Sequence, residues 1–80
     1  MNLDDVEIWR VWDDSVGKNI ADHARPSWIK KGVLMVKVTD NVWLQELEFM
    51  AEKIRERLNN KLKRNAIKKI RFKVGTLSKE

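Results

Sequence analysis

The 80-residue sequence contains no cysteine, no tyrosine and only one histidine, His23. Without cysteine it can form neither a disulfide nor a thiolate metal site, so packing alone must stabilise its small core. Catalytic nucleophiles need a base within hydrogen-bond reach, and His23 is the only candidate base. We therefore expect a structural or exposed His23, no catalytic residues, no metal and no cofactor. The sequence predicts a protein that is not an enzyme and has no small-molecule substrate.

Glycine and long apolar segments are also scarce. Gly17, Gly32 and Gly75 are isolated, which excludes glycine-rich loops that bind phosphates or dinucleotides. It also excludes the Gly-x-x-Gly loop by which KH domains clamp nucleotides. The longest apolar segment spans residues 33–36, far short of the roughly 18 residues that cross a bilayer. Because the acidic N-terminus resembles no targeting signal, we expect a cytoplasmic protein that has no membrane partner.

Basic residues predominate, with 17 Lys and Arg against 12 Asp and Glu, a net charge of +5. Residues 1–20 hold two basic and five acidic residues, a net −3, whereas residues 53–79 hold eleven basic and one acidic residue, a net +10. A field of one sign attracts polyanions, and nucleic acid is the commonest of these in the cytoplasm. The alternative is a charged surface that only keeps the domain soluble.

A helix is expected at the start of the chain. Its apolar residues recur at helical spacing, at Ile8, Trp9, Trp12 and Val16. Asn2 is the expected N-cap of this helix, and Gly17 its left-handed C-cap. A short helical turn through residues 20–24 should follow and end at Pro26.

The next segments are expected to form a β-hairpin and a long helix. Lys31-Gly32 is a two-residue turn signal between β-rich residues 27–30 and 33–38. Polar capping residues at 39–41 then mark a change to helical periodicity. One apolar stripe follows, at Leu44, Leu47, Ala51, Ile54, Leu58 and Leu62. The stripe predicts a single long helix whose fraying end is marked by Asn59, Asn60 and Asn65.

Apolar and basic residues alternate in the segment 67–74, which is expected to form a half-buried strand. Ile70, Phe72 and Val74 share one side, and the other side is a basic row of Lys69, Arg71 and Lys73. The fold class is therefore α+β, a single domain over residues 1–80 with the order α-β-β-α-β. We expect the helices on one face of a three-stranded mixed sheet. Small domains with this arrangement include the KH-like folds.

Two groups of residues are candidate binding sites. The candidates for nucleic-acid binding come from the basic segment, and they are Lys61, Lys63, Arg64, Lys68, Lys69, Arg71 and Lys73. Of the four tryptophans, Trp9 and Trp12 are expected in the core. Trp28 and Trp43 are the candidates for partner binding, because an exposed aromatic ring can stack on a base or anchor a protein interface. The alternative for both is the rim of the core, with the indole N–H reaching water.

Nearly the whole chain, from Ile8 to Gly75, carries an ordered set of short motifs. They are Trp12, Val16-Gly17, residues 20–24 with Pro26, residues 32–38, residues 43–47, Leu58-Asn59 and residues 70–75. In their order and spacing the motifs resemble the DciA family, formerly a domain of unknown function. The resemblance implies a bacterial protein whose single KH-like domain is similar to the N-terminal domain of that family and lacks the Gly-x-x-Gly clamp.

The resemblance also implies a function. Members of the DciA family assist the loading of the DnaB-type replicative helicase onto DNA, and they bind both the helicase and DNA without using ATP. The first hypothesis is therefore a non-enzymatic, sequence-nonspecific binder of single- or double-stranded DNA that acts in helicase loading. The second is a protein-interaction module whose basic surface has no nucleic-acid partner. Basic residues gathered beside an exposed tryptophan would favour the first hypothesis, and an exposed apolar patch the second.

Overall fold

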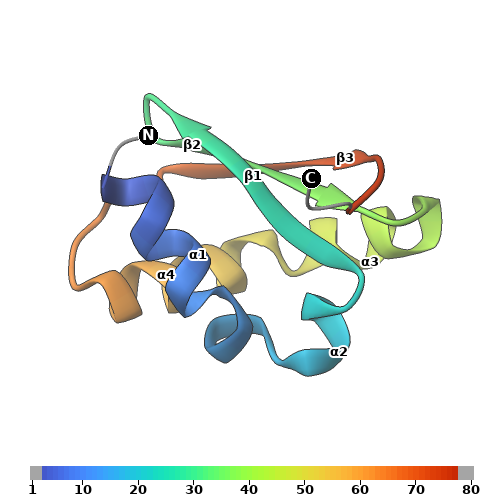
Figure 1. Ribbon diagram of the computed structural model, residues 1–80, viewed down its shortest axis with the longest axis horizontal. Helices are drawn as coiled ribbons and strands as arrows, with labels where there is room; N and C mark the ends of the chain where they lie inside the picture. Colours follow the sequence, from blue (N-terminus) through green and yellow to red (C-terminus); the bar gives the residue numbers. More distant parts are fainter. Residues whose placement is uncertain (1–2, 78–80) are drawn as a thin grey trace.

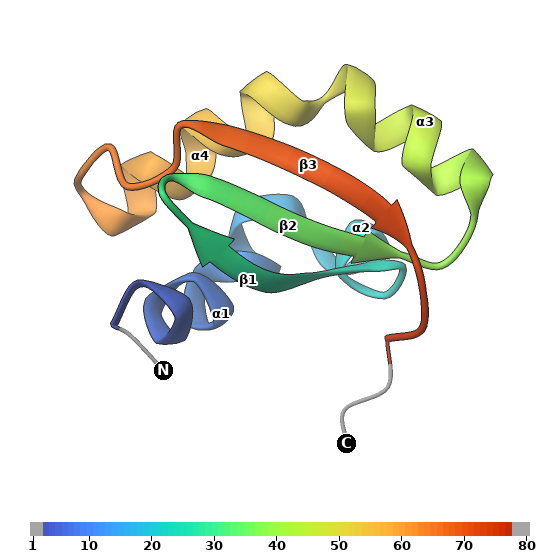
Figure 2. The same cartoon turned by 90° about the horizontal axis from the view of Figure 1, so that it is seen from above.

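A three-stranded sheet and a layer of helices form the two layers of the computed structural model, which describes residues 3–77 (Figure 1). The helices cover one face of the sheet and leave the other face open (Figures 1 and 2). The elements are α1 (Leu3–Val16), α2 (Lys18–Ala21), β1 (Ala24–Lys30), β2 (Val33–Val38), α3 (Asn41–Phe49), α4 (Ala51–Leu62) and β3 (Lys69–Val74). The expected α+β class and one-sided helical layer are confirmed. The expected cap Asn2 lies outside the described residues.

The sheet has the strand order β1-β2-β3 and is mixed, as expected. β1 and β2 pair antiparallel and β2 and β3 pair parallel. The predicted hairpin turn is confirmed, with φ of 52° at Lys31 and 81° at Gly32, and two positive φ angles are typical of a type I′ turn. The Gly32 carbonyl accepts hydrogen bonds from the Lys68 and Lys69 amides at 2.7 and 3.2 Å. The hairpin tip is thereby tied to the start of β3.

The region around Pro26 differs from the expectation. The helical turn ends at Ala21, and Ala24, expected in that turn, is the first residue of β1. Pro26 lies inside β1 instead of ending a helix. Because β1 is an edge strand, the missing N–H of proline can face away from the sheet.

A bulge interrupts the pairing of β1 with β2. Pro26 lies opposite Val36, and the next pair along the strands is Trp28 opposite Met35, so that Ser27 is the extra residue. An extra residue shifts the alternation of the strand by one position. Trp28 consequently points to the same face as Met35, away from the helices.

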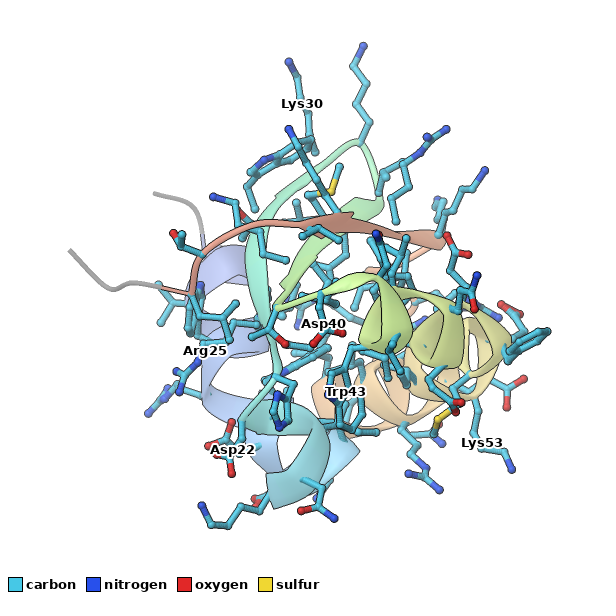
Figure 3. The ribbon with its side chains drawn as sticks, turned by 90° about the vertical axis from the view of Figure 1, so that its right-hand side faces the viewer. Asp22, Arg25, Lys30, Asp40, Trp43 and Lys53 are labelled. Carbon is cyan, nitrogen blue, oxygen red and sulfur yellow. The ribbon has the colours of Figure 1, made fainter. Side chains whose placement is uncertain are left out.

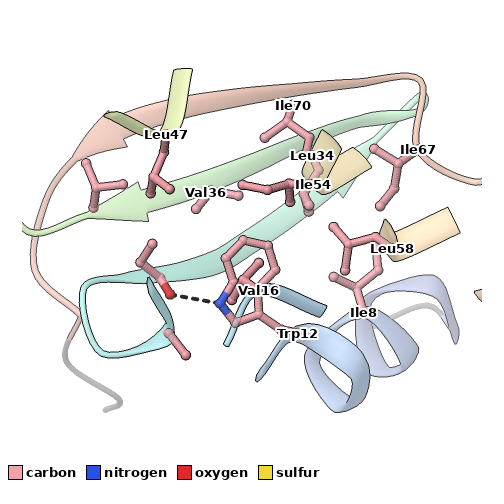
Figure 4. Packing of buried hydrophobic residues seen from close by; sticks show 13 residues of the cluster. Ile8, Trp12, Val16, Leu34, Val36, Leu47, Ile54, Leu58, Ile67 and Ile70 are labelled. Atoms are coloured by element: carbon pink, nitrogen blue, oxygen red, sulfur yellow. Dashed lines mark hydrogen bonds between the residues drawn. The ribbon is translucent and has the colours of Figure 1, made fainter. Parts of the chain in front are cut away.

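The core lies between the sheet and the helices (Figure 4). From the sheet it takes Leu34, Val36, Val38 and Ile70, and from the helices Ile8, Trp12, Val16, Leu47, Ile54 and Leu58. The buried Trp12 donates its indole N–H to the Ala24 carbonyl at 2.9 Å. Trp12 is thus in the core, as expected.

The core position expected for Trp9 is wrong, because 46% of this residue is exposed. Ile8, Trp12 and Val16 are four residues apart and line the inner side of α1. Trp9 follows Ile8 by one residue, which turns it by about 100° around a helix of 3.6 residues per turn. Its ring therefore leaves the core and lies at the surface beside β1.

The single long helix that the sequence predicts is two helices, α3 and α4, which meet at Met50. Met50 has φ −100° and ψ 2°, and its amide donates to the Leu47 carbonyl at 3.0 Å, a tighter turn than the α-helix. The apolar stripe nevertheless continues through both helices, with Leu47, Ile54 and Leu58 fully buried. The expected start is confirmed, since the Asp40 side chain caps α3 by accepting from the Trp43 amide at 3.0 Å.

Asn59 does not mark a fraying helix end, as the sequence suggests, but is buried in α4. Its side-chain amide donates to the Ile67 carbonyl at 2.9 Å, and its side-chain oxygen accepts from the Ile67 amide at 2.9 Å. Ile67 precedes β3 and is itself fully buried. This pair of hydrogen bonds, called here the Asn59 clamp, fixes the segment that leads into β3 to the end of α4.

Arg55 supports the same segment from one helical turn earlier. It donates to the Ile67 carbonyl at 3.3 Å and to the Glu52 carboxylate at 2.6 and 3.0 Å. The hydrogen bond from Arg55 lowers the pKa of Glu52 and raises the pKa of Arg55. Because the folded pKa of Glu52 is depressed, its contribution to stability is present above its unfolded pKa and is lost as the pH falls through the folded pKa.

Candidate nucleic-acid interface

The register of the sheet places nine side chains on the face that the helices leave open. Leu34, Val36 and Val38 of β2 face the core, so the alternate residues and their paired neighbours face outward. They form three rows across the strands: Arg25, Lys37 and Lys73; Trp28, Met35 and Arg71; Lys30, Val33 and Lys69. We call this surface the outer sheet face.

The outer sheet face carries six cations and no anion. The cations are Arg25, Lys30, Lys37, Lys69, Arg71 and Lys73, and none of the three strands contains Asp or Glu. Lys30 extends from the hairpin end of β1 on the side away from the helices (Figure 3). Lys31 in the turn and Lys68 before β3 add two more cations at the hairpin end. With no acidic neighbour on the strands, the whole face has one sign of charge.

Trp28 stands in the middle row of this face. It is paired with Met35 of β2, which is paired in turn with Arg71 of β3. The residue is 47% exposed. An accessible indole therefore lies between two rows that contain the remaining cations.

A pocket of about 140 Å³ lies at the end of the outer sheet face near Trp9. Its lining comes from α1, from β1 and β2, and from the segment after β3, and consists of Trp9, Arg25, Pro26, Ser27, Lys37, Thr76 and Leu77. The exposed ring of Trp9 and the cations Arg25 and Lys37 thus share one hollow. The second exposed indole of the molecule is therefore adjacent to the same basic surface.

The structure divides the predicted basic segment into two groups. Lys69, Arg71 and Lys73 lie on the outer sheet face, and the side chain of Lys68 lies over Gly32 at its hairpin end, where a Cβ on the glycine would be 3.0 Å from the Lys68 Cγ. Lys61, Lys63 and Arg64 lie instead at the end of α4. Lys61 borders two hollows between α1 and α4, and Arg64 pairs with Glu7 of α1 at 2.6 Å. The second group therefore belongs to the helical layer.

The second predicted tryptophan, Trp43, is partly buried in the first turn of α3 and packs against the core. Its ring stacks on His23, with ring centroids 4.7 Å apart and an angle of 13° between the planes. The Nδ1 atom of His23 lies 3.3 Å from the Thr39 hydroxyl. His23 therefore has a structural environment, and only part of the Trp43 ring is available to a partner (Figure 3).

Sequence reasoning missed the cations that β1 and β2 bring to the outer sheet face. The alternation of residues 33–38 puts Lys37 on the side opposite Leu34 and Val36, but the sequence does not show in which register this strand pairs with residues 69–74. Arg25 and Lys30 could not be assigned to a face at all, because the bulge at Ser27 changes the alternation of β1. Sequence reasoning also missed Phe49, which is 90% exposed at the end of α3.

Comparison with known families shows a match over most of the chain. The family described as "Dna[CI] antecedent, DciA" has a model that matches residues 2–72. The chain belongs to the DciA family. Membership in the DciA family suggests a role related to helicase loading in DNA replication, and this is not a family of enzymes. No curated protein matches the chain.

The described residues contain neither a group of side chains suited to a metal ion nor a helix suited to a membrane. Within residues 3–77 no three His, Asp or Glu side chains are grouped so that they could hold a metal ion. No helix in the same part of this DciA-family chain has the length and apolar character that a membrane span needs. The outer sheet face is therefore the main candidate site that the described residues offer.

Proposed function

We propose that this protein binds DNA through its outer sheet face and contacts the DnaB-type replicative helicase through a separate surface, and so assists helicase loading. The observation that carries the DNA-binding part is the set of six cations from three strands with no acid among them. Lysine and arginine side chains that neutralise phosphates release condensed counterions, which gives affinity without sequence preference. No catalytic step is involved.

The alternative is a protein-interaction module whose basic surface meets an acidic partner. The two hypotheses differ in what accompanies the basic residues. Here Lys69, Arg71 and Lys73 are gathered beside the exposed Trp28, which favours nucleic acid over a purely protein partner. Binding of DNA by the purified protein decides between them.

Affinity for labelled oligonucleotides should fall steeply as salt rises and should vary little with sequence. If four to six of the cations contact phosphates, raising the salt from 50 to 200 mM lowers the affinity roughly 50- to 1000-fold. Fluorescence anisotropy at several salt concentrations, with two unrelated sequences of equal length, measures both properties. Undetectable binding at the lowest ionic strength would exclude the proposed DNA-binding function.

For the helicase contact we propose the exposed side of α3. Phe49 is 90% exposed and Val42, two helical turns earlier, is 71% exposed. Between residues 41 and 52 the chain has Glu46, Glu48 and Glu52 and no basic residue. An exposed aromatic ring within acidic surroundings repels DNA but suits a protein pocket that has a basic rim. Trp43, the anchor expected from the sequence, offers a smaller exposed surface on the same helix.

Replacing Phe49 with Ser should weaken binding to the cognate helicase at least tenfold, because a buried aromatic anchor commonly contributes about 2 kcal/mol or more. Thermal stability and DNA affinity should not change, since the ring has little contact within the fold. Titration calorimetry with the helicase measures the effect. The control is Val6→Ser, which removes an exposed apolar side chain from α1. Wild-type helicase affinity in the Phe49 variant would place the contact elsewhere.

A further inference from the structure

We propose that the outer sheet face prefers single-stranded DNA, because a base of the strand stacks on the exposed indole of Trp28. The inference rests on the DNA binding proposed above and adds to it the strand preference and the residue that provides it. The position of Trp28 supplies the first argument. Its row lies between the row of Arg25, Lys37 and Lys73 and the row of Lys30, Val33 and Lys69.

This arrangement combines the two elements of a single-strand binding surface. Cations on both sides of the indole can hold phosphates on either side of a stacked base, because each flanking row is about 7 Å from the row of Trp28. An aromatic ring between them can stack on a base, and every base has a face that can be stacked. The surface therefore needs no hydrogen bonds to base edges and no sequence preference.

A duplex cannot use the indole in this way. Its bases are stacked on one another, so that it presents mainly phosphates and sugars to a flat sheet. The uncharged ring of Trp28 gains little from such groups, whereas the six cations attract the phosphates of either form. Trp28 thus adds affinity for single strands alone.

The bulge in β1 and the position of Trp9 support the same inference. Ser27, the extra residue, puts the large ring of Trp28 at the surface, although burying it would add to a small core. Trp9 is exposed beside the same face and shares a pocket with Arg25 and Lys37. A DNA strand that leaves Trp28 toward this end of the sheet meets a second indole in the same pocket as two cations.

The test compares Trp28→Leu with Trp28→Phe and the wild-type protein. Each is titrated with a labelled 15-nucleotide oligo(dT) and with a 15-base-pair duplex at one salt concentration. The leucine variant should lose roughly five- to hundredfold in affinity for oligo(dT) and change less than twofold for the duplex. The phenylalanine variant, which keeps a ring, should retain most of the affinity. Oligo(dT) should also quench tryptophan fluorescence more in the wild type than in the Trp28→Phe variant.

Three results would overturn the stacking role. In the first, the leucine variant binds oligo(dT) with wild-type affinity. In the second, its affinities for oligo(dT) and for the duplex fall equally. In the third, its affinity for the helicase falls while its affinity for oligo(dT) does not change. In each of these cases the proposed DNA binding itself stands. Wild-type protein that binds neither form of DNA would instead remove the proposed function. Trp28→Thr, which suits an exposed strand, replaces the leucine variant if the latter melts early.

Discussion

Reversing Lys69, Arg71 and Lys73 to Glu should lower the affinity for DNA at least a hundredfold at low salt. The three substitutions change the charge of the outer sheet face from +6 to zero. Three lost phosphate contacts should also reduce the slope of log affinity against log salt by roughly 2 to 3. The fold should persist, because these side chains are exposed and alternate with Ile70 and Phe72, which face the helices. Anisotropy titrations at several salt concentrations and a circular dichroism spectrum provide the measurements.

A matched control distinguishes the effect of the outer sheet face on DNA affinity from the effect of the total charge. Lys53, Lys61 and Lys63 are exposed on α4 and at its C-terminus, and Lys53 extends from the helical layer in Figure 3. Their reversal to Glu changes the net charge by the same amount but leaves the outer sheet face intact. We expect this variant to lose less than tenfold. Equal losses in the two triple variants would show that binding follows net charge and has no defined surface.

Replacing Asn59 with Ala should destabilise the protein by about 2–3 kcal/mol, because it leaves the buried Ile67 amide without a hydrogen-bond partner and opens a small cavity. For a domain of this size that corresponds to a fall in melting temperature of roughly 10–20 °C. Arg55 can still donate to the Ile67 carbonyl, so the loss is concentrated on the amide. A chemical denaturation curve and a thermal melt measure the change.

Asn60 provides the control for this prediction. It is the next residue in α4, it has the same side chain and it is exposed. The Asn60→Ala variant should differ from the wild type by less than about 0.5 kcal/mol, as surface substitutions usually do. Similar stability of the two alanine variants would show that the Asn59 clamp contributes little.

Elements whose physics is local could be predicted from the sequence. The hairpin follows from the turn preference of Lys31-Gly32 and from the alternation of residues 33–38, and the structure has β2 at those residues. The alternation of the last segment predicted which side of β3 is basic. Asp40 caps α3 because it precedes an amphipathic helix. Each of these features is set by residues that are neighbours along the chain.

Features that depend on tertiary packing were predicted wrongly or not at all. The apolar stripe from Leu44 to Leu62 has an unbroken helical period, so nothing in it reveals the break at Met50. Trp9 and Trp12 are both tryptophans in the apolar pattern of α1. Only the packing of α1 against the sheet shows that Trp12 is buried and Trp9 is exposed. The sequence suggests that Asn59 marks the end of a helix, and only its hydrogen bonds to Ile67 in the folded structure show its role in the core.

The candidate site was foreseen only in part for the same reason. Four of the seven basic residues proposed from the sequence, Lys68, Lys69, Arg71 and Lys73, lie on or beside the outer sheet face. The remaining cations of that face come from strands distant in the sequence, which only the sheet register brings into line. Phe49 could have been noticed as an apolar residue outside the stripe of its helix, next to acidic residues.

The bulge at Ser27 decides which side chains in the second half of β1 face the solvent. If Ser27 instead paired with Met35 in an uninterrupted ladder, Trp28 would lie opposite Leu34, on the side of the core. Ile29 would then be exposed and the charged end of Lys30 would turn toward the helices. Regular pairing of the same residues would thus exchange the two faces of half a strand, whereas deletion of Ser27 would leave Trp28 opposite Met35. The aromatic surface of β1 therefore depends on how the backbone pairs as well as on which residue stands at position 28.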